Sequence, residues 1–131
     1  MKKLKVFSVK EPIFKTEPLF VYGCSYEQMH RYLRRRFKTA KLKEKEVNED
    51  PGTASTIRFS GPPWRVVWFE KINKRSLESH GEIVHELFHL VVRICEDKGI
   101  PIKANIETGE CGDETAAYLM DFFMREVWRR V

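Results

Sequence analysis

The chain has 131 residues, a length that suits one domain with a single hydrophobic core. Nine Phe, four Tyr and three Trp stand among 42% hydrophobic residues, which excludes a wholly disordered chain. No apolar run approaches the ~20 residues of a membrane-spanning helix. Lys10 and Glu11 follow the basic start too early for a secretory signal. We therefore expect a single cytoplasmic domain over 1–131 that makes no membrane contact.

The cysteines and the net charge narrow the class of protein further. Cys24, Cys95 and Cys111 form an odd set without CxxC spacing, which favours reduced thiols over a disulfide framework. The net charge is +5, and most of the positive excess lies between Arg31 and Lys45. Such a balance permits an anionic partner without requiring one.

The first half of the chain predicts two strands, a helix and a hairpin. Short strands are expected at 4–9 and 19–22, and a helix at 26–38 begins with a capping box formed by Ser25 and Gln28. A charged loop at 41–52 follows. Strands at 53–60 and 64–70 flank a Gly-Pro-Pro turn, and the second strand is apolar on both faces.

The second half predicts two helices. The first is capped by Ser76 and runs to about Asp97, before Gly99 and Pro101. A polar loop over 100–111 precedes a last helix from Glu114 to about Arg130. The element order indicates an α+β fold.

The long helix carries an HExxH motif, His85-Glu86-Leu87-Phe88-His89. Residues four apart lie on one helix face, so both imidazoles can reach one metal ion. Glu86 lies beside the pair, where it can take a proton from a metal-bound water. The apolar residues of this helix fill an arc of roughly 200°, so the helix is expected to be buried, with its polar strip lining a cleft. The alternative is a buried histidine pair satisfied by carbonyl groups.

A catalytic zinc ion usually takes three protein ligands, so one more residue is required. No histidine follows His89, which leaves carboxylates and Cys111 as candidates. Glu96 lies roughly 10 Å further along the helix, too far for the same ion. We favour Glu114 at the start of the last helix, then Glu110 in the loop, where Glu107 also lies, with Cys111 less favoured.

These residues give the sequence a resemblance to the glutamate-type zincins. His85–His89 followed by Glu114-Thr115-Ala116-Ala117-Tyr118 is most similar to the small ImmA/IrrE-like metallopeptidases and their phage-encoded relatives, over roughly 53–130. The resemblance implies a zincin-like core, in which a small twisted sheet packs on the buried HExxH helix. It also implies that His85, His89 and Glu114 bind one zinc ion, with Glu86 as the general base. Residues 1–52 stay unassigned.

The sequence departs from that family pattern at Tyr118. Many glutamate-type zincins have Asp four residues after the ligand Glu, to orient a histidine. Here Asp121 or Asp113 could take that part. Tyr118 is either an oxyanion-stabilising group of the catalytic site or an ordinary packed tyrosine.

The implied activity is zinc-dependent hydrolysis of a peptide bond in a protein or peptide substrate. In zincins an edge strand often binds the substrate backbone, and we expect the strand at 64–70 to do so. His30 and His80 are expected to be capping or surface residues. The oligomeric state is left open.

The alternative is a nucleic-acid-binding or phage virion-assembly protein with a structural or vestigial metal site. Neighbouring acidic residues dilute the cationic stretch, so we favour a solvated helix face over nucleic-acid binding as its interpretation. The cations that could meet phosphates are Arg31, Arg34, Arg35, Arg36, Lys38, Lys41, Lys43 and Lys45.

Overall fold

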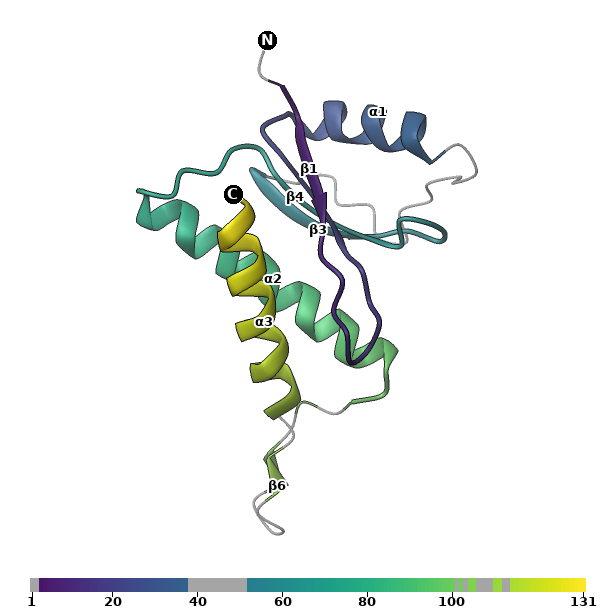
Figure 1. Cartoon of the computed structure of the whole chain (residues 1–131), viewed down its shortest axis with the longest axis vertical. Helices are drawn as coiled ribbons and strands as arrows, with labels where there is room; N and C mark the ends of the chain where they lie inside the picture. The colour runs from purple at the N-terminus through teal and green to yellow at the C-terminus, as the bar shows by residue number, and fades with distance from the viewer. Residues whose placement is uncertain (1–2, 38–51, 101, 103, 106–109, 112–113) are drawn as a thin grey trace.

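A computed structural model describes residues 3–37, 52–100, 102, 104–105, 110–111 and 114–131. In these residues three helices and a four-stranded mixed sheet confirm the α+β class (Figure 1). The strands of the sheet are β1 (Lys5–Ser8), β2 (Leu19–Tyr22), β3 (Ala54–Arg58) and β4 (Arg65–Phe69). Two further short strands, β5 (Ala104–Asn105) and β6 (Glu110–Cys111), pair where the sequence predicted a polar loop.

The strand order in the sheet is β1-β2-β4-β3. Strand β4 pairs in parallel with β2 and antiparallel with β3, and all five of its residues are buried. The predicted hairpin and the two-sided burial of its second strand are thus confirmed. The expectation that 64–70 forms an edge strand is wrong, because β2 covers its other side. Within the described residues, β3 is the outer strand at this end of the sheet.

Helix α1 (Tyr26–Arg36) covers one face of the sheet (Figure 1). Its predicted capping box is confirmed, because Ser25 Oγ accepts from Gln28 N at 3.1 Å and Gln28 Oε1 accepts from Ser25 N at 2.8 Å. Met29 and Leu33 are buried there with Trp68 of β4. The helix ends at Arg36, and the predicted end at Lys38 lies outside the described residues.

Helices α2 (Leu77–Asp97) and α3 (Glu114–Arg130) cover the opposite face (Figure 1). Ser76 Oγ accepts from Ser79 N at 3.3 Å, which confirms the predicted cap, and Gly99 adopts φ 66° just after α2 ends. A positive φ carries no steric penalty for glycine, so Gly99 lets the chain leave the helix. None of the described helices has both the length and the apolar character needed to cross a membrane.

The larger of two buried clusters lies between the sheet and the pair α2 and α3. It joins Phe20, Val67 and Phe69 of the sheet to the apolar faces of both helices. Such a helix packed on a sheet holds its outward face in a fixed orientation, because the interior is close-packed. The helix residues of this cluster are Ile83, Leu87, Leu90, Val91, Ile94, Cys95, Leu119, Phe123 and Val127.

Candidate metal centre

The two histidines of the motif lie one turn apart on the exposed face of α2. Nε2 of His85 and Nε2 of His89 are 3.1 Å apart, and the ring planes are inclined at 77°. Two nitrogens bound to one tetrahedral zinc ion, each at 2.0–2.1 Å, lie about 3.3 Å apart. The same distance also suits a hydrogen bond between two neutral imidazoles, one donating to the other. The distance between the two nitrogens is therefore compatible with a shared metal ion and with a direct hydrogen bond.

Glu86 lies between the two histidines in sequence and turns toward the sheet. Although it belongs to the polar strip, it is only 7% exposed. Thr56 Oγ1 of β3 lies 2.7 Å from Glu86 Oε2 and 3.0 Å from the Glu86 carbonyl oxygen. One hydroxyl proton serves both contacts, and the shorter is to the charged oxygen. Strand β3 therefore holds the carboxylate of the HExxH motif in place.

A second contact between α2 and the chain leading into β3 involves residues that sequence reasoning missed. Thr53 Oγ1, just before β3, donates to Glu82 Oε2 at 2.6 Å. Glu82 lies three residues before His85, so it belongs to the same polar strip of the helix. That spacing was the only signal available in the sequence. Glu82 and Glu86 thus bind two threonines that lie three residues apart.

Two apolar residues next to the histidines are exposed. Val84 is 43% exposed and Phe88 is 55% exposed, although the sequence placed both in a wide buried arc. The expected arc of roughly 200° is therefore too wide. Their side of α2 is left uncovered in the described structure, whereas Glu86 on another side of the helix is covered by Thr56 of β3.

The candidate third ligands lie in different elements of the structure. Helix α3 begins at Glu114, as predicted, and this residue is exposed. Glu110 and Cys111 form β6, with their side chains outside the described set, and Glu107 and Asp113 are also outside it. Among the described side chains, no group of three or more His, Cys, Asp or Glu residues could hold a metal ion. The structure thus brings the two histidines together without Glu114, whose role stays a prediction.

Tyr118 contacts the first part of the chain. Its hydroxyl donates to Oε1 of Glu11 at 3.0 Å, and Glu11 is fully buried. The same carboxylate accepts from the backbone N–H groups of Ile13 and Phe14 at 2.8 and 2.6 Å. Burial, then the hydrogen bond and the charge of Glu11, raise the pKa of Tyr118 above its usual value. An oxyanion role would require this hydroxyl to leave Glu11, so that role also stays a prediction.

The remaining candidates have ordinary structural surroundings. Asp121 pairs with Arg125 at 3.0 Å, one turn along the exposed side of α3. His80 packs against Trp128 and contacts the Lys74 carbonyl oxygen, and His30 packs edge-on against Tyr26. The described free thiols, Cys24 and Cys95, are buried, and burial raises the pKa of both, which makes them poor nucleophiles.

Comparison with known proteins identified no relative of the chain. Neither models of protein families, nor curated proteins, nor solved structures match the chain significantly.

Proposed function

We propose that the chain is a zinc-dependent peptidase with a zincin-like core, related to the ImmA/IrrE-like and phage-encoded metallopeptidases. The observation that supports this most is the convergence of His85 and His89 at 3.1 Å beside the buried carboxylate of Glu86. Two nitrogen ligands and an adjacent fixed base are the parts that metal-assisted hydrolysis requires. A satisfied histidine pair alone would not need a carboxylate held in place by the neighbouring strand.

In this proposal His85 and His89 hold the ion and Glu86 moves the proton. Zinc bound there supplies a Lewis acid that makes water a nucleophile near neutral pH. Glu86 accepts the proton of the attacking water and passes it to the leaving amine. The hydroxyl of Thr56 binds one carboxylate oxygen, so Glu86 keeps its orientation while it loses and gains the proton.

Glu114 is the proposed third ligand, with Glu110 and Cys111 as the alternatives. Its position at the first residue of α3 supports it, because a carboxylate at a helix N-terminus is stabilised by the helix dipole. Catalytic zinc sites commonly combine two histidines with one glutamate.

Strand β3 is the proposed binding edge for an extended substrate. It is the outer strand within the described residues, and Thr56 links it directly to Glu86. A peptide that adds to a sheet edge gains main-chain hydrogen bonds along its length. The exposed Val84 and Phe88 lie next to the histidines and offer apolar contact to substrate side chains.

Replacing Glu86 tests the proposal. We expect Glu86→Gln to keep zinc and lose hydrolysis of a fluorescently labelled, unfolded protein substrate. The side chain keeps its size and its bond to Thr56 but no longer accepts a proton. The matched control is Glu82→Gln, on the same helix face and bonded to Thr53, which should retain activity. If Glu86→Gln hydrolysed the substrate as fast as the wild type, the peptidase hypothesis would be refuted. The proposed metal site would not be affected by that result.

A further inference from the structure

Trp64 is an exposed aromatic residue held in an ordered turn. It lies just before β4 and is 58% exposed, although it is the largest type of side chain. Its backbone adopts φ 65°, which residues other than glycine rarely do. Two hydrogen bonds fix it there, from Trp64 N to the Gly61 carbonyl oxygen at 2.8 Å and from Phe59 N to the Trp64 carbonyl oxygen at 2.7 Å. The ring is therefore presented outward by a defined backbone.

Two hollows are lined by Trp64, and a third shares a lining residue with the larger of them. The largest has a volume of about 830 Å³ and is lined by the β1–β2 connection, the end of α1, the end of α2 and Trp64. A smaller one of about 100 Å³ shares Trp64 and Arg65 with it. A third of about 230 Å³ lies along α1 and shares Tyr32 with the largest. Tyr32 and Trp64 each line two of these hollows, and the three hollows together are called here the aromatic track.

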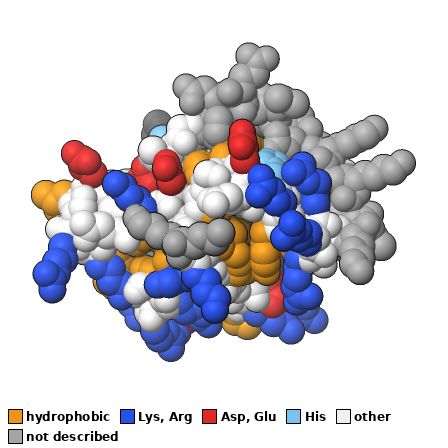
Figure 2. Space-filling model, turned by 90° about the horizontal axis from the view of Figure 1, so that it is seen from above, with side chains coloured by type: hydrophobic (Ala, Val, Ile, Leu, Met, Phe, Trp, Pro, Cys, Tyr) orange, Lys and Arg blue, Asp and Glu red, His pale blue; other side chains and the backbone are white. Residues whose placement is uncertain are grey.

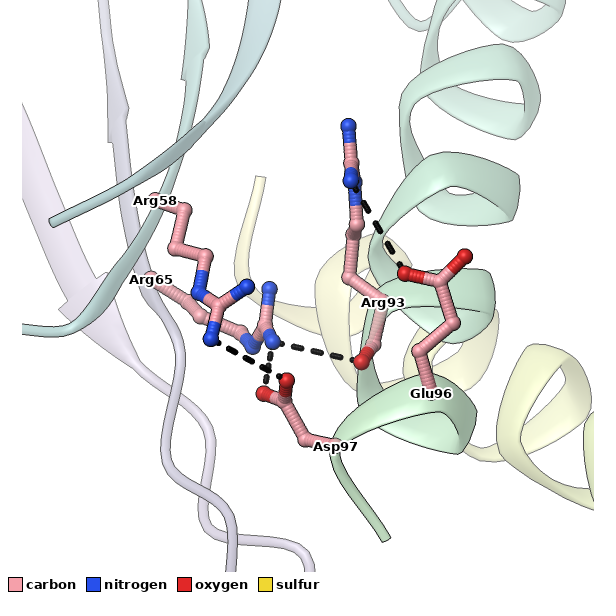
Figure 3. A network of polar contacts seen from close by, with 5 residues as sticks. All are labelled: Arg58, Arg65, Arg93, Glu96 and Asp97. Carbon is pink, nitrogen blue, oxygen red and sulfur yellow. Dashed lines mark hydrogen bonds and ion pairs between the residues drawn. The ribbon is translucent and has the colours of Figure 1, made fainter. Parts of the chain in front are cut away.

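Among the charged residues that line the aromatic track, cations outnumber carboxylates. Its carboxylates are those of Glu17, which accepts from Ser8 Oγ at 3.1 Å, and Asp97, which pairs with Arg65 and Arg58 (Figure 3). Seen from the α1 side, Lys and Arg side chains surround exposed hydrophobic ones (Figure 2). Two of the lining cations, Arg58 and Arg65, pair with Asp97. The other lining cations are Lys15, Arg31, Arg35, Arg36 and Lys98.

We propose that the aromatic track binds single-stranded nucleic acid. Proteins that bind single strands combine a cationic groove, which follows the phosphates, with aromatic rings on which the bases stack. Trp64 and Tyr32 supply rings at the two junctions of the track, and cations line each hollow. An acidic polypeptide would use the cations alone, and a duplex keeps its bases stacked inside. Neither partner accounts for the outward Trp64.

This site is separate from the proposed metal centre. Asp97, in the track, follows His85 by twelve residues of one helix, which is about 18 Å. The proposal also assigns a function to the α1 arginines, which peptide hydrolysis does not use. Binding to nucleic acid should therefore survive in Glu86→Gln, and loss of one activity would leave the other measurable.

The test is fluorescence anisotropy with a labelled oligothymidylate of about 16 nucleotides at low and moderate salt. We expect Trp64→Ala to weaken binding about tenfold or more, and Trp64→Phe to stay close to the wild type. Arg35→Ala should reduce the slope of log affinity against log salt by about 0.7. Arg125→Ala, on the exposed side of α3, is the matched control. It should leave both the affinity and its salt dependence unchanged.

Thermal unfolding by circular dichroism should show that Trp64→Ala folds, because most of the ring is outside the core. Absence of binding at low salt would overturn the proposal, as would unchanged affinity of folded Trp64→Ala. Tighter binding of a duplex of the same length, or equal competition by polyglutamate, would also overturn it and assign the surface to that partner instead.

Discussion

Thr56 of β3 binds the side chain of Glu86 through a 2.7 Å hydrogen bond, although the two residues are 30 positions apart. The bond joins β3, an outer strand of the sheet, to the glutamate of the HExxH motif. Since Glu86 is almost fully buried, this donor replaces a hydrogen bond that water would otherwise make to the carboxylate. Thr56 is therefore the residue through which the sheet positions the proposed base.

Removing the hydroxyl of Thr56 should destabilise the fold. Thr56→Val preserves the shape of the side chain but leaves a buried carboxylate without its donor, which costs about 1–3 kcal/mol. Urea denaturation measures the free energy of unfolding. Thr56→Ser should recover most of the loss. Thr53→Val breaks an exposed bond to Glu82 and should cost only about 0.5 kcal/mol. A Thr56→Val variant as stable as the wild type would show that the bond does not stabilise Glu86.

The third metal ligand can be identified by comparing three substitutions. We expect Glu114→Ala to weaken zinc binding at least tenfold, because one of the proposed protein ligands is lost. Glu110→Ala and Cys111→Ala should bind zinc as the wild type does. Competition with a chromophoric chelator measures the affinities. A loss confined to Cys111→Ala or Glu110→Ala would transfer the ligand role to that residue.

Substituting Asp97 should lower the free energy of unfolding more than substituting Arg65. Arg65 is buried and donates to Asp97 and to the Arg93 carbonyl oxygen (Figure 3). Burial, with the nearby charges of Arg58 and Arg93, lowers the pKa of Arg65 to about 10. Asp97→Ala leaves that buried charge without its carboxylate and should cost about 3 kcal/mol. Arg65→Met removes the charge and keeps apolar volume, so it should cost less than about 1 kcal/mol. The reverse order in urea denaturation would contradict this account.

The pKa of Tyr118 should be raised in the folded protein. Burial is the main cause, followed by the hydrogen bond and the charge of Glu11. The stabilisation by the neutral hydroxyl is complete below the unfolded pKa of about 10, and is lost as pH rises through the higher folded pKa. Tyrosinate absorbance of the wild type minus that of Tyr118→Phe measures the shift. Glu11→Gln should return the pKa only partly, because burial persists. A folded pKa at or below 10 would refute the Glu11 contact.

Local features of the fold could be predicted from the sequence. The caps at Ser25 and Ser76 depend on residues three positions apart, and the hairpin of β3 and β4 on a short turn. The place of β4 inside the sheet could not be predicted, because it depends on pairing with β2 across an intervening helix. For the same reason, the bonds from Thr56 to Glu86 and from Tyr118 to Glu11 had no sequence signal.

In the candidate site too, features set by local spacing could be predicted, and features set by contacts between distant elements could not. The histidine pair depends on helical spacing alone, so the HExxH pattern was enough to predict that His85 and His89 converge. Exposure of Val84 and Phe88 depends on which faces of α2 other elements cover, which periodicity does not show. The third ligand likewise depends on how α3 meets α2, and spacing along the chain does not determine it.

Elemental analysis of the purified protein, prepared without chelator, tests the central claim most directly. The account predicts about one zinc ion per chain in the wild type and in Glu86→Gln, and loss of zinc in His85→Ala, because the proposed site takes one ligand nitrogen from each histidine and these nitrogens lie 3.1 Å apart. A wild-type protein without zinc, or zinc retained fully in His85→Ala, would contradict it.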